Sequence, residues 1–211
     1  MVNCSSWPRT TFPRSQVALG NALVSEAVLR HPPPVRSRYH IHDPAPAHFV
    51  TGTIIEWLPV FTTSARCDIL VDALLYCREH KALRIHAWVI LDNHFHAILA
   101  APDLTRVLAD FKRYTAKALL AQLKTDQCDW LLNQLSYFRL KHKVESEHQI
   151  WQEGSHPQAI LSDEMMQQKL EYLHNNPVKR GLVASQEHWR HSSAHEWLPG
   201  GMPLLRCDGW R

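Results

Sequence analysis

Apolar side chains recur between residues 49 and 124 with the two periods that distinguish strands from helices. Three stretches rich in β-branched and aromatic residues predict strands: Phe49–Trp57, Leu83–Leu91 and His94–Ala100. Apolar spacings of three and four residues predict helices over Asp68–His80 and Leu104–Lys124. Asp92 and Asn93 are typical turn residues. The second and third strands are therefore expected to form a hairpin.

The pattern is weaker after residue 124. Residues 125–147 show no clear period, and Ile150–Trp151 predicts only a short strand. Ser162–Asn175 predicts a helix with Ser162 as its N-cap, and Pro177 is expected to end it. The resulting order places a hairpin between two helices. This order favours an antiparallel α+β sandwich of the split β-α-β kind over a parallel sheet.

Composition indicates one folded domain with extensions. The chain has 211 residues, 45% of them apolar, with eight tryptophans, which is typical of a globular fold. Residues 1–36 mix Ser, Pro and Arg and end in HPPPVR, so we expect a flexible or extended N-terminal arm. A start codon placed too far upstream would explain this segment equally well. Residues 37–200 are expected to form the main domain, and residues 201–211 a C-terminal tail.

Charge and cysteine content say little about the partners or the cellular location of the protein. The net charge is +3, and residues 1–42 hold five arginines and one acid. Nucleic-acid affinity in the body would therefore come from local patches, although an ordinary solvated surface explains the same charges. No apolar run approaches the roughly 20 residues that span a bilayer. The five scattered cysteines form no CxxC pair. We expect a cytoplasmic protein without membrane contact.

His94 and His96 are the first candidates for chemistry. Side chains alternate along a strand, so both imidazoles should point to one face while Phe95 packs on the other. Two imidazoles one pleat apart can bind a single divalent ion. About one such pair is expected by chance, and the chain has two, the other being His40 and His42. The motif alone is therefore weak evidence. The position of His94 and His96 at the start of a central strand is what supports a metal site. Hydrogen-bonded structural histidines are the alternative.

The segment EYLHNNPVKRGL, Glu171–Leu182, carries the second candidate. Tyr172 and Asn176 are four residues apart and so share one face of a helix. The phenol could attack a phosphorus atom, and the carboxamide could complete a metal site. Spacing alone favours the plainer alternative, in which Tyr172 lies at the edge of the core and Asn176 caps the helix.

Together these segments resemble a known family. RIHAWVILDNHFHAIL, WQEGSHPQAI and KLEYLHNNPVKRGLV, followed by EHWRHSSA, are similar to the REP-associated tyrosine transposases. These belong to the single-tyrosine HUH transposase superfamily. The resemblance covers about residues 38–198. It rests on the combination of a histidine–hydrophobic–histidine strand with a tyrosine helix that runs into an asparagine-proline pair.

The resemblance implies a fold and a reaction. The fold would be a ferredoxin-like βαββαβ core with an antiparallel sheet. Tyr172 would be the nucleophile that forms a covalent phosphotyrosine, and His94, His96 and Asn176 would bind Mg²⁺ or Mn²⁺. The DNA partner would be a short palindromic hairpin with single-stranded flanks, which the enzyme cuts and rejoins. The sequence leaves open whether the enzyme acts as a monomer or a homodimer.

Tyr114 is a rival nucleophile on the helix predicted over Leu104–Lys124. It also lies beside basic residues, so composition does not separate it from Tyr172. The residue four positions after Tyr114 is Ala118, which cannot bind a metal, whereas Asn176 can. We therefore predict Tyr172 as the nucleophile.

Several basic patches are expected to contact DNA, and two other functions stay open. Each cation is by itself typical of a solvated surface, but together they form a plausible track beside the site. The competing functions are a metal-dependent nuclease that uses water and a catalytically silent DNA-hairpin-binding protein. The predicted DNA contacts are Arg36, Arg38, Lys112, Arg113, Lys117, Arg139, Lys141, Lys143, Lys179 and Arg180.

Overall fold

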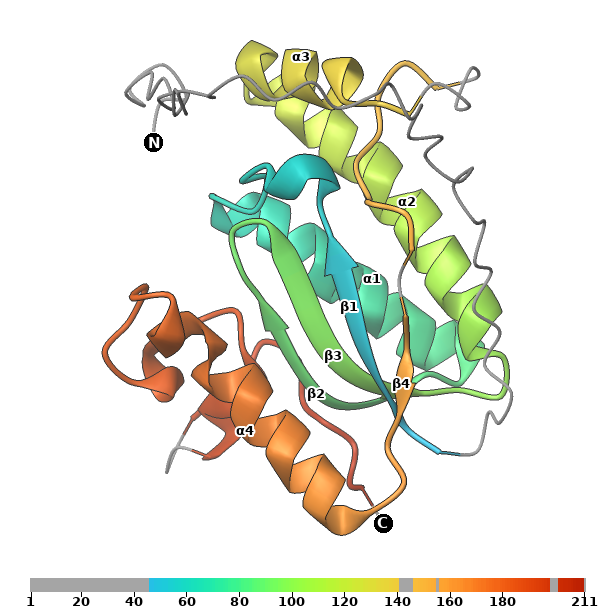
Figure 1. Ribbon diagram of the computed structural model, residues 1–211, viewed down its shortest axis with the longest axis vertical. Helices are drawn as coiled ribbons and strands as arrows, with labels where there is room; N and C mark the ends of the chain where they lie inside the picture. Colours follow the sequence, from blue (N-terminus) through green and yellow to red (C-terminus); the bar gives the residue numbers. More distant parts are fainter. Residues whose placement is uncertain (1–45, 141–145, 155, 198–200, 211) are drawn as a thin grey trace, which may run out of the picture.

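The computed structural model describes residues 46–140, 146–154, 156–197 and 201–210 (Figure 1). The predicted arm and the pair His40 and His42 lie outside these ranges. Three short 3-10 segments, at Ile55–Trp57, Gln186–His188 and Ser193–Trp197, accompany the longer elements. In chain order these are β1 His48–Thr53, α1 Ser64–Lys81, β2 Arg84–Ile90, β3 His94–Ala100, α2 Leu104–Thr125, α3 Asp129–Tyr137, β4 Gln158–Ala159 and α4 Asp163–Lys179.

The sheet has the order β2-β3-β1-β4, and every neighbouring pair is antiparallel. This order confirms the predicted α+β class with a ferredoxin-like βαββαβ core. The fourth strand is β4, whereas the predicted strand Ile150–Trp151 contributes only an isolated bridge between Trp151 and Ile54. The reason lies in the indole: its Nε1 donates to the Lys112 carbonyl and to Thr115 Oγ1, both at 3.1 Å. Trp151 thus belongs to the layer of α2.

Helices cover both faces of the sheet. In Figure 1, α1 and α2 lie behind the sheet, and α4 lies in front of it. Strand side chains alternate accordingly. Phe95 and Ala97 of β3 join the core formed with α1 and α2, whereas Ile98 joins Leu173 of α4 in a second core. Because His94 and His96 alternate with Phe95 and Ala97, both histidines face the α4 side.

Gly52 fixes how β1 and β3 fit together. It pairs with Phe95 across the strands, and a Cβ at this position would lie 2.1 Å from Phe95 Cε1. A larger residue would push the ring out of its place. The absent side chain of Gly52 therefore lets Phe95 anchor β3 with its histidines on the opposite face.

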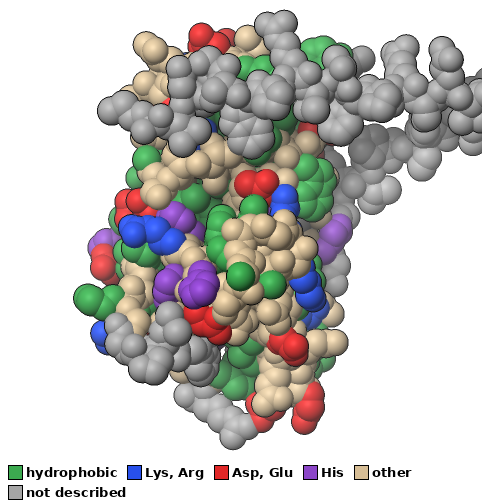
Figure 2. Space-filling model, turned by 90° about the vertical axis from the view of Figure 1, so that its left-hand side faces the viewer, with side chains coloured by type: hydrophobic (Ala, Val, Ile, Leu, Met, Phe, Trp, Pro, Cys, Tyr) green, Lys and Arg blue, Asp and Glu red, His purple; other side chains and the backbone are tan. Residues whose placement is uncertain are grey.

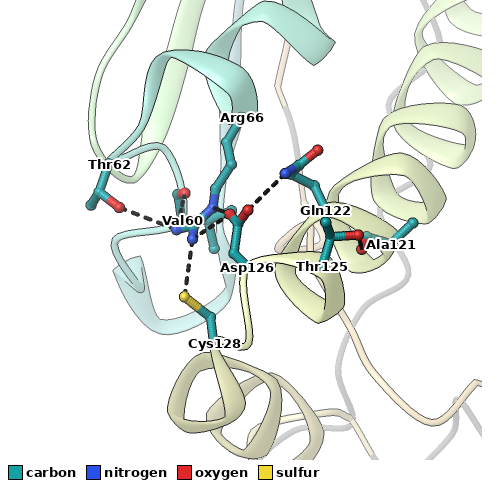
Figure 3. A network of polar contacts seen from close by, with 8 residues as sticks. All are labelled: Val60, Thr62, Arg66, Ala121, Gln122, Thr125, Asp126 and Cys128. Carbon is teal, nitrogen blue, oxygen red and sulfur yellow. Dashed lines mark hydrogen bonds and ion pairs between the residues drawn. The ribbon is translucent and has the colours of Figure 1, made fainter. Parts of the chain in front are cut away.

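A buried arginine joins the start of α1 to the loop between α2 and α3 (Figure 3). Arg66 is 1% exposed. Its guanidinium forms an ion pair with Asp126 at 2.7 Å and donates to Cys128 Sγ at 3.0 Å. Gln122 Nε2 donates to the other carboxylate oxygen of Asp126 at 2.7 Å. The charge is thus paired, as burial requires.

Two predictions about helices after residue 124 were incomplete or wrong. Helix α3 lies in the region that showed no period. Pro177 does not end α4, because the helix continues to Lys179. Proline removes one donor and crowds the carbonyl four residues earlier, but the next turn still closes through the Arg180 N–H to Asn176 carbonyl bond at 3.1 Å.

The actual stop of α4 is Gly181, which has a φ of +69°. Its N–H donates to the Val178 carbonyl at 2.9 Å, and the Leu182 N–H donates to the Pro177 carbonyl at 3.0 Å. These two bonds form a Schellman motif, in which glycine adopts the left-handed conformation at low cost. At the other end of α4 the predicted N-cap is confirmed, since Ser162 Oγ accepts from the Met165 N–H at 3.2 Å.

Residues 201–210 run along β2. The Trp88 indole donates to the Leu205 carbonyl at 3.0 Å, and the Ile85 N–H donates to Asp208 Oδ2 at 2.7 Å. Leu205 is buried in the core shared with α1 and α2. This segment thus packs against the sheet. In the ranges that the structure describes, no helix is both long and apolar enough to cross a membrane.

Candidate active site

The two histidines of β3 form a buried pair. Each side chain is 5% exposed, and the ring centroids lie 4.7 Å apart. His96 Nδ1 lies 2.8 Å from Oγ1 of Thr51, its partner across β1. His96 Nε2 is buried and has no hydrogen-bond partner among the residues that the structure describes. A buried, unsatisfied ring nitrogen is costly unless another group binds it.

Asn93 orients the second histidine. Its Oδ1 lies 2.7 Å from His94 Nδ1, and its Nδ2 donates to the Trp57 carbonyl at 3.2 Å. Arg180 donates to the same Oδ1 at 3.0 Å and pairs with Asp92 at 2.9 Å. Because a carbonyl oxygen only accepts, the proton of His94 lies on Nδ1. Nε2 of His94 then carries the lone pair that a metal would need.

Burial keeps both histidines neutral. It lowers the pKa of His94 to about 4, with a further contribution from the Arg180 charge. The pKa of His96 falls to about 3, first through burial and then through the charges of His94 and Lys169. Metal ions bind the neutral imidazole, so no proton competes for either site near pH 7.

Tyr172 lies over this pair from α4. Its ring centroid is 5.4 Å from that of His96 and 5.9 Å from that of Phe49, and the residue remains 43% exposed. Lys179 Nζ lies 5.5 Å from the Tyr172 ring. Tyr114, the rival nucleophile, is 60% exposed on α2, which belongs to the layer on the other side of the sheet. Of the two tyrosines, only Tyr172 contacts a histidine of the pair.

Asn176 is the remaining predicted metal ligand. It is 8% exposed on α4, one turn after Tyr172. In the described ranges no three His, Cys, Asp or Glu side chains are grouped to hold a metal. A metal ion bound at the histidine pair would therefore need a ligand of another type, and a carboxamide oxygen is one that Mg²⁺ and Mn²⁺ accept. The unsatisfied Nε2 of His96 and the neutral imidazoles fit such an ion.

The predicted DNA contacts fall into separate groups. Lys179 lies at the Tyr172 ring, while the Arg180 guanidinium is already bonded to Asp92 and Asn93. Figure 2 shows histidine side chains gathered beside Lys and Arg side chains on one face of the molecule. The remaining cations do not contact the histidine pair or lie outside the described ranges: Lys112, Arg113 and Lys117 on α2, the half-buried Arg139, and Arg36, Arg38, Lys141 and Lys143, which the structure does not describe.

The cluster on α2 is also less available than its sequence suggested. Burial lowers the pKa of Lys112 to about 8. The Arg113 guanidinium lies 3.1 Å from Asp110. Lys117 is exposed. These three residues belong to the layer opposite α4, so a track that joins them to Tyr172 stays a prediction.

Sequence reasoning missed three residues of the site. Thr51 contacts His96 across the sheet, but the register of β1 and β3 cannot be read from the sequence. Asn93 was recognised only as a turn residue, although its place directly before His94 was available as a signal. Lys169 Nζ lies 5.0 Å from the Phe49 ring and adds positive charge near His96. Its spacing of three from Tyr172 was the available signal.

No family model matches the chain. It is 28% identical over 141 residues to a putative REP-associated tyrosine transposase of Haemophilus influenzae, covering 62% of this chain and 74% of the relative. It is 24% identical over 135 residues to the REP-associated tyrosine transposase of Escherichia coli, covering 64% and 68% respectively.

A solved structure shares the fold. It is a REP-associated tyrosine transposase bound to a REP hairpin, with a TM-score of 0.54, 22% identity and coverage of 79% of this chain and 87% of that one. The fold that this chain shares with the solved structure is a βαββαβ sheet, and here its central strand carries a histidine pair beneath a helix with a tyrosine. In sequence and in fold, the chain is similar to the REP-associated tyrosine transposases.

Proposed function

We propose that this chain is a transposase that cuts and rejoins single-stranded DNA beside hairpins of the REP type, through a covalent bond between Tyr172 and the DNA. The observation that carries the proposal is the 5.4 Å approach of the Tyr172 ring to His96, whose Nε2 has no partner among the described residues. The names of the relatives, and the REP hairpin bound to the solved one, support the choice of DNA.

The histidine pair and Asn176 would hold the divalent ion, Mg²⁺ or Mn²⁺. Such an ion would supply Lewis-acid chemistry at the scissile phosphate. Thr51 and Asn93 hold the two Nδ1 atoms, so that both Nε2 atoms stay available. Outer partners of this kind orient metal-binding histidines.

Tyr172 supplies the nucleophile. Its phenolic oxygen attacks phosphorus and gives up its proton to solvent, and a new P–O bond forms. The bond to the 3′ oxygen of the DNA breaks, and this oxygen takes up a proton and leaves as a 3′-hydroxyl. The family resemblance implies that the tyrosine keeps the 5′-phosphate. Lys179 places a positive charge beside the ring, where negative charge develops on the phenol and the phosphate. A DNA 3′-hydroxyl can later displace the tyrosine, so rejoining needs no external energy source.

Incubation of the protein with a REP-type hairpin carrying labelled single-stranded flanks, in the presence of Mn²⁺, tests this function. We expect a labelled protein–DNA band that survives SDS, with the adduct on the Tyr172 peptide by mass spectrometry. Nicked DNA without an adduct would instead support a nuclease that uses water. Binding without nicks or an adduct would support a silent hairpin-binding protein.

A further inference from the structure

Two consecutive residues beside the histidine pair adopt an unusual backbone conformation. Glu56 has a φ of +49° and Trp57 a φ of +55°. Side chains with a Cβ disfavour this left-handed region, and such residues tend to persist where they serve a site. Burial of the indole does not explain the conformation, because Trp57 is 55% exposed.

The strained segment is bonded to the site. The Trp57 carbonyl accepts from Asn93 Nδ2 at 3.2 Å, and the same amide holds His94 through Oδ1. The indole lies 5.4 Å from the His94 ring, centroid to centroid, at an angle of 75°. An exposed aromatic surface is therefore held at the edge of the catalytic pair.

We propose that Trp57 is a stacking platform for an unpaired nucleobase in the single-stranded flank next to the scissile phosphate. This inference rests on the proposed function. Indole stacks on the π-face of any base, which suits a strand that must be held whatever its sequence. Lys179, which lies at the Tyr172 ring, adds a cation for the phosphates of the same strand. A nucleotide has both a flat ring and a charged backbone, and this neighbourhood offers a surface for each.

Trp130 provides a matched control within the chain. It is 58% exposed, close to the value for Trp57, but it lies on α3 in ordinary helical conformation. In the part of the chain that the structure describes, Trp130 does not contact the histidine pair, whereas Trp57 lies against His94. A Trp130 variant thus separates the general effect of losing an exposed indole from the specific effect of losing Trp57.

The test uses full-length protein with Tyr172→Phe, so that cleavage does not complicate binding. Affinity is measured by fluorescence anisotropy for a hairpin with a single-stranded flank and for the same hairpin without it. Trp57→Ala should weaken binding of the flanked hairpin about tenfold or more, the loss typical of one base–aromatic stack. Binding of the flankless hairpin should not change. Trp57→Phe should keep most of the affinity, and Trp130→Ala should change neither.

A second measurement guards against a folding defect in the alanine variant. With 2-aminopurine in the flank, the Tyr172→Phe protein should quench its fluorescence, and Trp57→Leu, which keeps an apolar side chain, should remove most of the quenching. Equal affinity losses on both DNAs, or unchanged quenching, would overturn the platform. If the Tyr172→Phe protein bound neither hairpin, the proposed function itself would fail, and the platform with it.

Discussion

The two faces of the sheet come from the same strands but differ in the side chains that they bury. The face toward α1 and α2 carries the larger apolar core, and the buried charge of Arg66 is paired with Asp126. On the face toward α4, His94 and His96 are buried, and one ring nitrogen has no partner in the described ranges. The first face is held together by apolar packing and by a paired buried charge, and so contributes stability. The second retains groups that a ligand can satisfy, as functional sites commonly do.

Loss of the buried Arg66–Asp126 pair should have the largest effect on the stability of the fold. Arg66→Ala leaves a partly buried carboxylate and several acceptors without their partner, so we expect the free energy of unfolding to fall by about 3–5 kcal/mol. Urea denaturation measures this change. Arg113→Ala, which removes an exposed ion pair with Asp110, should cost less than about 1 kcal/mol. Equal losses in the two variants would remove the distinction between the faces.

Acid should lower the stability of the protein through the two buried histidines on the face toward α4. An unfolded histidine takes up a proton near pH 6.5, but folded His94 and His96 do so only near pH 4 and 3. The unfolded state therefore binds more protons between these values, and stability of the metal-free protein falls as the pH drops below about 6.5. His96 alone should account for about 3 kcal/mol between pH 7 and pH 4, at about 1.4 kcal/mol for each pKa unit.

Chemical denaturation across this pH range measures the effect. His96→Gln carries no titrating ring at this position and should flatten the profile. Stability that stays constant or rises toward pH 4 in the unmodified chain would show that the histidines are not held neutral by burial.

The outer partners of the histidines should tune metal affinity. Asn93→Ala or Thr51→Val should weaken Mn²⁺ binding about 10- to 100-fold, because the rings lose the contacts that orient them. Isothermal titration calorimetry gives the affinity, with His96→Ala as the reference that removes a ligand. Asn133→Ala, at an exposed position of α3, should leave affinity unchanged. Unaltered binding in both outer variants would leave Asn93 and Thr51 with a structural role only.

The sequence predicted the elements with strong local periods. The predicted strand His94–Ala100 coincides with β3, and the helix over Leu104–Lys124 differs from α2 by one residue. Helix α3 was missed because its nine residues bury only Leu131 and Leu135, too few for a period to stand out. β4 has only two residues, and its place depends on pairing with His48 and Phe49 of β1, which no local pattern encodes.

The candidate site could also be predicted only in part from the sequence. The histidine pair and Tyr172 stood out through alternation and through the family resemblance. Thr51 did not, because cross-strand contacts depend on register. Nor did Trp57, since the sequence suggested that β1 continued through it, whereas the chain turns after Thr53 into a left-handed pair of residues. The prediction that Pro177 ends the helix was wrong, because the helix ends at the Schellman motif in which Gly181 adopts the left-handed conformation.

The two exposed tyrosines give the most direct test, because they sit on opposite sides of the sheet. Tyr172→Phe and Tyr114→Phe each remove one oxygen and change packing volume little, so fold and hairpin binding should survive in both. Each variant is incubated with flanked hairpin DNA and Mn²⁺, and the SDS-resistant adduct is quantified. The adduct should vanish in Tyr172→Phe and persist in Tyr114→Phe. The reverse pattern would contradict the assignment of the active site to the α4 face, and the role of Asn176 would fail with it.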